Sequence, residues 1–177
     1  MGDDKNRRQL KGYEKMLERV TDLLEEAGEQ ARPRLRDALE KARKRAVELG
    51  ELSSEEASRI REYIQRDIED AAHYLSRDDT DDDLRGWFRM DLALIENWLL
   101  DRFTSVADRT RLELQALQQD LARSALWHTG EISGPGELRC TACGKVLRFT
   151  EAGHVPPCPA CRGTDFQRLT REDEAAD

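Results

Sequence analysis

Apolar residues in the first part of the chain recur at the spacing of an α-helix. Near the N-terminus the stripe consists of Leu10, Tyr13, Leu17, Val20 and Leu24. Three of these leucines stand seven residues apart, a recurrence typical of a helix that packs along another helix. The pattern therefore predicts a first amphipathic helix whose apolar face is covered by a neighbouring helix.

Two further helices are expected to follow the first. Gly28 and Pro33 interrupt the pattern, and a second stripe opens after them at Leu35, Leu39, Ala42, Ala46 and Leu49. Gly50 provides a natural C-terminal stop for this helix. Ser53 and Glu56 have the spacing of a capping box, which indicates the start of a third helix. The third stripe is Ala57, Ile60, Ile64, Ile68, Ala71 and Leu75.

An acidic segment separates these helices from a second helical stretch. Its aspartates are Asp78, Asp79, Asp81, Asp82 and Asp83. Their mutual repulsion favours a solvated connection, and the later ones can cap the next helix. Beyond them lie apolar positions at Leu84, Trp87, Phe88, Leu92, Ile95, Trp98 and Leu99, with a fresh stripe from Leu114. These positions predict either two helices or one long helix bent around residues 105–110.

The last part of the chain has the patterning of strands. Residues 145–150 alternate and contain β-branched and aromatic side chains, which predicts a strand. Residues 151–153 are expected to form a turn, and residues 155–157 an extended return. The outer strands are expected at residues 137–139 and 165–168.

The four cysteines of the chain form two Cys-x-x-Cys pairs. Cys140 stands with Cys143, Cys158 stands with Cys161, and fourteen residues separate the pairs. Two such pairs can complete a tetrahedral shell of four thiolates around one ion. Soft thiolates select zinc, with iron as the rival. We therefore expect one structural zinc ion held by these four cysteines, with no open position for catalysis.

Other roles for the cysteines need different surroundings. Disulfides need an oxidising compartment, and residues 1–5 contain no apolar signal segment. A thioredoxin-like redox role needs one Cys-x-x-Cys at the start of a helix. A rubredoxin-like iron electron carrier shares the ligand set and stays open as an alternative. We expect a cytoplasmic protein without membrane attachment, because the sequence has no run apolar enough to cross a bilayer.

These patterns predict a mainly α fold with two domains. Residues 1–129 would form an N-terminal helical bundle or antiparallel coiled coil, and residues 130–170 a small C-terminal β zinc ribbon. Residues 171–177 would be a disordered acidic tail. A ribbon of this size is too small to bury an adequate core, so metal coordination would supply most of its folding free energy.

The net charge of −8 lies mainly in the helical part, which has 23 Lys+Arg and 29 Asp+Glu. An acidic body argues against a general nucleic-acid binder. The ribbon itself carries a net charge of +1, so nucleic-acid binding through the ribbon alone stays possible. The seven-residue recurrence also allows self-association.

The segments that flank the cysteine pairs carry specific motifs. Trp127-His128-Thr129-Gly130-Glu131 and Gly134-Pro135-Gly136-Glu137-Leu138 precede the first pair, and Asp165-Phe166-Gln167-Arg168 follows the second. In the helical part, Leu49-Gly50-Glu51-Leu52 is followed by a Ser-x-x-Glu motif. In these features the chain resembles the YbeL-type zinc-ribbon proteins of bacteria over nearly its whole length. The resemblance implies metal binding and no particular reaction.

The first functional hypothesis is a non-catalytic adaptor that presents a rigid ribbon to a protein partner. An enzyme is not expected, because the sequence contains no phosphate-binding glycine loop, nucleophile elbow or His-Glu-x-x-His motif. The contacts of the adaptor are expected at basic ribbon residues that we predict to be exposed, namely Arg139, Lys145, Arg148 and Arg168.

The second hypothesis is regulation of transcription. The five aspartates of residues 78–83 would form the acidic tip of a helical hairpin that enters a channel of RNA polymerase. This hypothesis rests on analogy with bacterial factors that join such a hairpin to a four-cysteine zinc module. Electron transfer through bound iron is kept as a third class.

Overall fold

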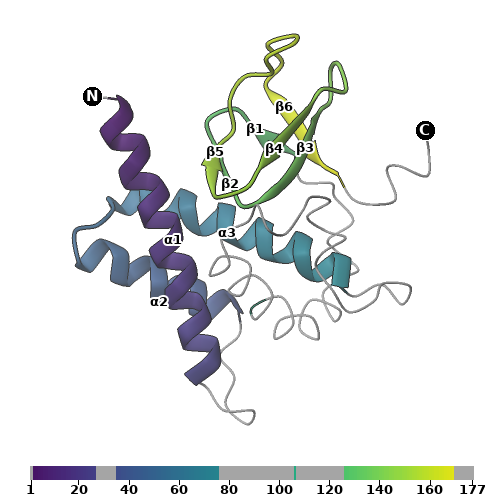
Figure 1. Ribbon diagram of the computed structural model, residues 1–177. Coiled ribbons are helices and arrows are strands. Elements are labelled where there is room, and N and C mark those ends of the chain that lie inside the picture. The colour runs from purple at the N-terminus through teal and green to yellow at the C-terminus, as the bar shows by residue number, and fades with distance from the viewer. Residues whose placement is uncertain (1, 27–34, 76–105, 107–125, 170–177) are drawn as a thin grey trace.

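Three helices form the N-terminal part of the molecule. The computed structural model describes residues 2–26, 35–75, 106 and 126–169 (Figure 1). Helix α1 spans Gly2–Glu26, α2 spans Leu35–Glu48 and α3 spans Ser54–Leu75, and each of the three contacts the other two. The three predicted N-terminal helices are therefore confirmed, as is the mainly α character of this part of the chain.

The apolar stripes of the three helices meet in one core. From α1 the core takes Tyr13, Met16, Leu17, Val20 and Leu24, and Leu10 packs against its edge. From α2 and α3 it takes Leu35, Ala38, Leu39, Ala42, Ala46, Ala57, Ile60, Ile64, Ile68 and Ala71. Most of these are the positions that helical spacing selects, because a residue three or four places along a helix returns to the same face.

Local hydrogen bonds define the junction between α2 and α3. Gly50 has a φ of 66°, and its N–H donates to the carbonyl of Val47 at 3.0 Å, so it ends α2 as expected. At the start of α3, the Ser53 N–H donates to Oε2 of Glu56 at 3.0 Å. The Glu56 N–H donates in return to Oγ of Ser53 at 3.2 Å, which confirms the capping box.

Six short strands form the C-terminal part, in two antiparallel sheets. The strands are β1 Trp127–His128, β2 Ile132–Ser133, β3 Gly136–Cys140, β4 Val146–Phe149, β5 Gly153–His154 and β6 Asp165–Arg168. One sheet has the order β1-β6-β3-β4, and the other consists of β2 and β5. The predicted strand over residues 145–150 is observed as β4, one residue shorter at each end.

The larger sheet begins before the domain boundary that we expected at residue 130. Trp127 pairs with Phe166, and His128 pairs with Asp165, so β1 forms the edge of the sheet beside β6. The segment just before residue 130 is therefore part of the ribbon. Helical periodicity does not reveal a two-residue strand, because its pairing partner lies far along the chain.

The smaller sheet joins the ribbon to the helices. Strand β2 contacts α3, and β5 contacts α1, so this sheet lies between the helices and the larger sheet (Figure 1). Ile132 of β2 and Ala152 beside β5 are buried in the helical core. A second, smaller core fills the ribbon and contains Trp127, Leu138, Cys140, Val155, Cys158 and Phe166. The ribbon thus covers one side of the helical core.

Several expectations fall outside the described residues. They are the fourth helical stretch, the acidic segment with Asp78, Asp79, Asp81, Asp82 and Asp83, and the tail at residues 171–177. Within the described part, none of the helices combines the length and the apolar character needed to cross a bilayer.

Candidate metal centre

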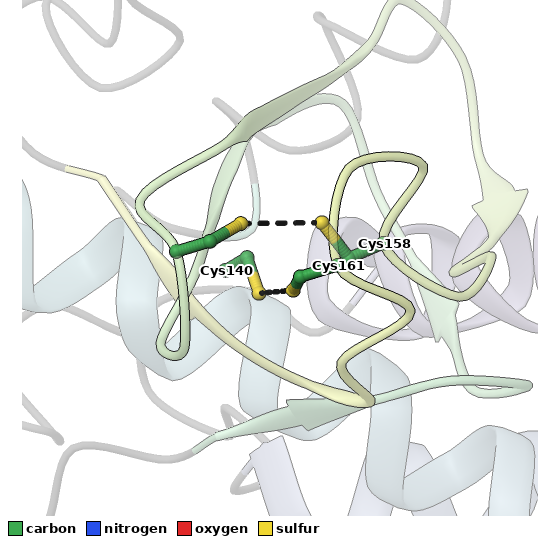
Figure 2. Close-up of side chains that lie close together, drawn as sticks. Cys140, Cys158 and Cys161 are labelled. Carbon is green, nitrogen blue, oxygen red and sulfur yellow. Dashed lines mark hydrogen bonds between the residues drawn. The ribbon is translucent and has the colours of Figure 1, made fainter.

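The four cysteine sulfurs come together at one point of the ribbon. The Sγ atoms of Cys140, Cys143, Cys158 and Cys161 all lie within 4.8 Å of one another. Sγ of Cys140 is 3.6 Å from Sγ of Cys161, and Sγ of Cys143 is 3.6 Å from Sγ of Cys158. Figure 2 shows the sulfurs of Cys140 and Cys161 turned toward each other from opposite loops.

These distances fit a metal held by four thiolates. A tetrahedron with metal–sulfur bonds of about 2.3 Å places its sulfurs about 3.8 Å apart, close to the cross-loop distances here. The four cysteines are free thiols, two of them buried and two exposed. The site therefore has both the donor atoms and the geometry to bind a soft cation.

The first cysteine loop is shaped by backbone hydrogen bonds. The Gly144 N–H donates to the carbonyl of Cys140 at 2.9 Å, and the Cys140 N–H donates to the carbonyl of Lys145 at 2.9 Å. Gly144 has a φ of 75°, the left-handed conformation that glycine adopts without steric cost. The turn folds Cys143 back toward Cys140 so that both thiols face the same point.

The second loop repeats this geometry with different residues. The Arg162 N–H donates to the carbonyl of Cys158 at 2.8 Å, and the Cys158 N–H donates to the carbonyl of Gly163 at 2.9 Å. The left-handed residue here is Arg162, with a φ of 61°, at the position that Gly144 takes in the first loop. Gly163 instead leaves room for a cysteine sulfur, since a Cβ at this position would lie only 3.1 Å from Sγ of Cys140.

The thiols perturb one another because they share a small volume. The backbone N–H of Cys161, together with neighbouring donors, lowers the pKa of Cys158 to about 6. At Cys161 the N–H of Gly163 favours the thiolate, but hydrogen bonds with Cys143 and Cys140 outweigh it and raise the pKa of Cys161 to about 12. Several thiolates this close repel one another unless a cation lies between them, which again favours a metal site.

The comparison with known proteins agrees with this geometry. A family model described as a zinc-ribbon containing domain matches residues 22–170, which include all four cysteines. This chain belongs to that family. This membership and the match to the YbeL proteins described next together confirm the resemblance to YbeL-type zinc-ribbon proteins.

Individual relatives of the zinc-ribbon family match a shorter stretch. "Uncharacterized protein YbeL" of Escherichia coli strain K12 is 31% identical over 77 residues, which are 44% of this chain and 48% of that protein. The YbeL proteins of strains O6:H1 and O157:H7 match with the same figures. The chain thus aligns with about half the length of the curated relatives it matches. No solved structure gives a significant match.

Three of the four basic residues predicted to bind a partner are accessible. Lys145 and Arg148 are exposed, and Arg139 is half-buried on β3. The Arg148 side chain is 74% exposed, but its Nε donates to Oε1 of the buried Glu137 at 2.6 Å. Arg148 is thus held against the sheet while most of its side chain faces solvent.

The prediction that Arg168 is exposed is wrong. Arg168 is only 4% exposed, and its Nη2 forms an ion pair with Oδ1 of Asp67 at 2.8 Å. Its Nε lies 3.0 Å from Oδ2 of Asp70. It also donates to the carbonyl of Pro135 at 2.9 Å and to Oγ of Ser133 at 2.8 Å. Arg168 therefore joins the ribbon to α3 instead of facing a partner.

The burial of Arg168 follows from the alternation of β6. Side chains two residues apart share one face of a strand, so Arg168 lies on the same side as the buried Phe166. Its partner Asp67 is fully buried on α3, and helical spacing places it on the face of Ile60, Ile64 and Ala71. An acid on the apolar face of a helix was the signal in the sequence for this pairing.

Asp67 also binds α1 and a loop of the ribbon. The hydroxyl of Tyr13 donates to Oδ2 of Asp67 at 2.7 Å, and the Gly134 N–H donates to the same oxygen at 2.9 Å. Burial and the adjacent carboxylate raise the pKa of Tyr13 well above its ordinary value, so the hydroxyl remains a donor. We call Tyr13, Asp67, Asp70, Ser133 and Arg168 the interface network.

Trp127 packs beside this network between two guanidinium groups. Its ring lies 4.4 Å from Cζ of Arg66 and 4.8 Å from Cζ of Arg168. Arg66 donates to the carbonyl of Leu126 at 3.1 Å and to Oε2 of Glu131 at 2.8 Å. Trp127 thus belongs both to the core of the ribbon and to its interface with α3.

Proposed function

We propose that this chain is a non-catalytic zinc-binding adaptor whose helical body holds a zinc ribbon for recognition by another protein. The observation that carries the proposal is the convergence of four cysteine sulfurs in a ribbon that is anchored to the helices through buried contacts. Four thiolates fill a tetrahedral shell, which is the arrangement of structural rather than catalytic zinc sites.

Zinc is the ion that best fits the proposed role. When bound, it would cross-link the two cysteine loops and contribute about 10 kcal/mol or more to folding of the ribbon. Cys140, Cys143, Cys158 and Cys161 would be its ligands, and the N–H of Gly163, 3.4 Å from Sγ of Cys161, would stabilise one thiolate. Iron in the same shell, as in a rubredoxin-like electron carrier, is the alternative.

The accessible end of the ribbon supports a recognition role. Figure 1 shows the β3–β4 loop and the loop before β6 at the end of the ribbon that points away from the helices. Lys145 and Arg162 are exposed on these loops, and Arg148 is exposed on β4. These residues and the half-buried Arg139 are the basic groups that would attract an acidic segment of a partner.

The proposed helical body is a bundle. Pairwise contacts among α1, α2 and α3 support this description over a two-stranded antiparallel coiled coil. Transcription regulation through the aspartates of residues 78–83 stays a prediction, because those residues lie outside the described part of the chain.

The identity of the metal is tested on protein purified without added metal. Elemental analysis should find one zinc per chain, and the protein should be colourless. A coloured protein with one iron per chain would replace the zinc proposal with the electron carrier.

The adaptor role is tested by cross-linking in cells followed by affinity purification with and without nuclease. The variant combines Lys145→Glu with Arg162→Glu, and Arg59→Glu on the exposed face of α3 is the matched control. We expect a protein partner that resists nuclease and is lost only from the ribbon variant. A partner lost equally from the control, or capture that disappears with nuclease, would contradict the proposal, and the latter would indicate nucleic-acid binding.

A further inference from the structure

The interface network connects the cysteine site to the helices through a short structural path. Strand β6 follows the second cysteine pair directly and ends at Arg168. On the neighbouring strand β3, Cys140 pairs with Phe166, and Leu138 pairs with Arg168. The strand register that brings Cys140 to the cysteine site is thus the register that brings Arg168 to Asp67.

Loss of one partner from the interface network would also lower the stability of the protein. Asp67 is fully buried, and Arg168 supplies the guanidinium that forms an ion pair with it. A buried carboxylate whose cationic partner is removed is strongly destabilising, because neither water nor another charge replaces the lost contact. The helices and the ribbon are therefore each more stable when the other is folded.

We propose that the interface network couples metal binding at the cysteines to the packing of α1 and α3. A chain without metal loses the folded ribbon, withdraws Arg168 from Asp67 and uncovers the side of the helical core that Ile132 and Ala152 fill. The folded ribbon thus covers this side of the helical core only when metal is bound. The inference rests on the metal binding proposed above.

Coupling between two sites is reciprocal, so a change at the helices must alter the affinity of the cysteines for metal. This consequence is specific, because Asp67 lies 73 residues before the nearest cysteine and on a different element. A merely structural contact within the ribbon would not predict it.

The test measures the zinc affinity of the full-length chain by competition with a chromogenic chelator. We expect Asp67→Asn to weaken zinc binding by roughly 5- to 150-fold, the usual range for coupled sites. Tyr13→Phe removes only the hydrogen bond to Asp67 and should weaken binding less. Asp37→Asn, at an exposed position in the first turn of α2, is the matched control and should bind zinc like the parent chain.

A second measurement follows hydrogen exchange of the parent chain before and after zinc is removed by chelation. We expect faster exchange around residues 64–71 of α3 and around Tyr13 of α1. Folded Asp67→Asn and Tyr13→Phe chains with the zinc affinity of the control would overturn the inference, as would unchanged exchange in α3. If Asp67→Asn does not fold, Tyr13→Phe and the exchange experiment decide. A parent chain that binds no zinc would instead refute the proposed function.

Discussion

Gly136 and Arg168 fit together only because Gly136 has no side chain. A Cβ at Gly136 would lie 2.2 Å from Nη1 of Arg168, the nitrogen that donates to the carbonyl of Pro135. Gly136 also has a φ of 136°, a conformation that other residues adopt only with strain. The first residue of β3 is therefore matched to the guanidinium that joins the ribbon to α3.

Gly136→Ala should consequently destabilise the protein by about 2–4 kcal/mol, since backbone strain adds to displacement of a buried arginine. Urea denaturation of the zinc-loaded chain checks the value. Gly50→Ala is the comparison, because Gly50 also has a positive φ but nothing lies within 4 Å of its added Cβ. That variant should cost only about 1 kcal/mol. Equal losses from the two variants would mean that contact with Arg168 is unimportant.

Gly163→Ala should weaken metal binding, and any loss of stability should follow from that weaker binding. Its Cβ would lie 3.1 Å from Sγ of Cys140 and 3.2 Å from Sγ of Cys161, so at least one sulfur must move. We expect a loss of roughly tenfold or more in zinc affinity, similar to changes in groups that surround metal ligands. Chelator competition measures it, with Ala160→Ser in the same exposed loop as control. Unchanged affinity would show that the loop adjusts without moving the sulfurs.

Charge reversal should destabilise the protein much more at the buried Arg168 than at the exposed Lys145. Arg168→Glu places a third carboxylate beside Asp67 and Asp70 and should cost at least about 3–5 kcal/mol, as expected for a broken buried ion pair. Lys145→Glu changes an exposed loop residue and should alter the free energy of unfolding by no more than about 0.5 kcal/mol. Thermal denaturation followed by circular dichroism distinguishes them. Similar melting temperatures for both variants would contradict the buried position of Arg168.

The helices should lose stability in acid through two glutamates. The Ser53 N–H and the guanidinium of Arg8 lower the pKa of Glu56 to about 2, and Arg19 with Lys15 lowers the pKa of Glu51 to about 2. A carboxyl with a depressed pKa in the folded state stabilises above its unfolded value near 4.5, and this contribution disappears as the pH falls toward 2.

This dependence is checked on Glu51→Gln and Glu56→Gln by urea denaturation between pH 5 and pH 2.5. Both variants should be less stable than the parent chain at pH 5, and their stability should fall less steeply with acid. Glu55→Gln, on the exposed first turn of α3, should follow the parent chain. If the free energy of unfolding of all four proteins falls in parallel with pH, the lowered pKa of neither glutamate contributes to stability.

Features that depend on neighbouring residues could be predicted from the sequence alone. The stripes of α1, α2 and α3, the stop at Gly50 and the box of Ser53 with Glu56 each rest on contacts within one or two turns. The same holds for each Cys-x-x-Cys loop, whose two thiols converge through backbone hydrogen bonds between residues four or five apart. Local geometry determines these elements, so the pattern of residue types is sufficient.

The tertiary structure alone decided which charged residues are buried. Arg168 and Asp67 are 101 residues apart, and although Asp67 stands on the apolar face of its helix, the sequence does not identify Arg168 as its partner. Only the contact of Arg168 on β6 with α3 places them in one buried network, and only the pairing of β1 with β6 makes β1 part of the ribbon. Charged side chains enter a protein interior when a partner is already there, and a partner supplied by a distant segment is invisible to local periodicity.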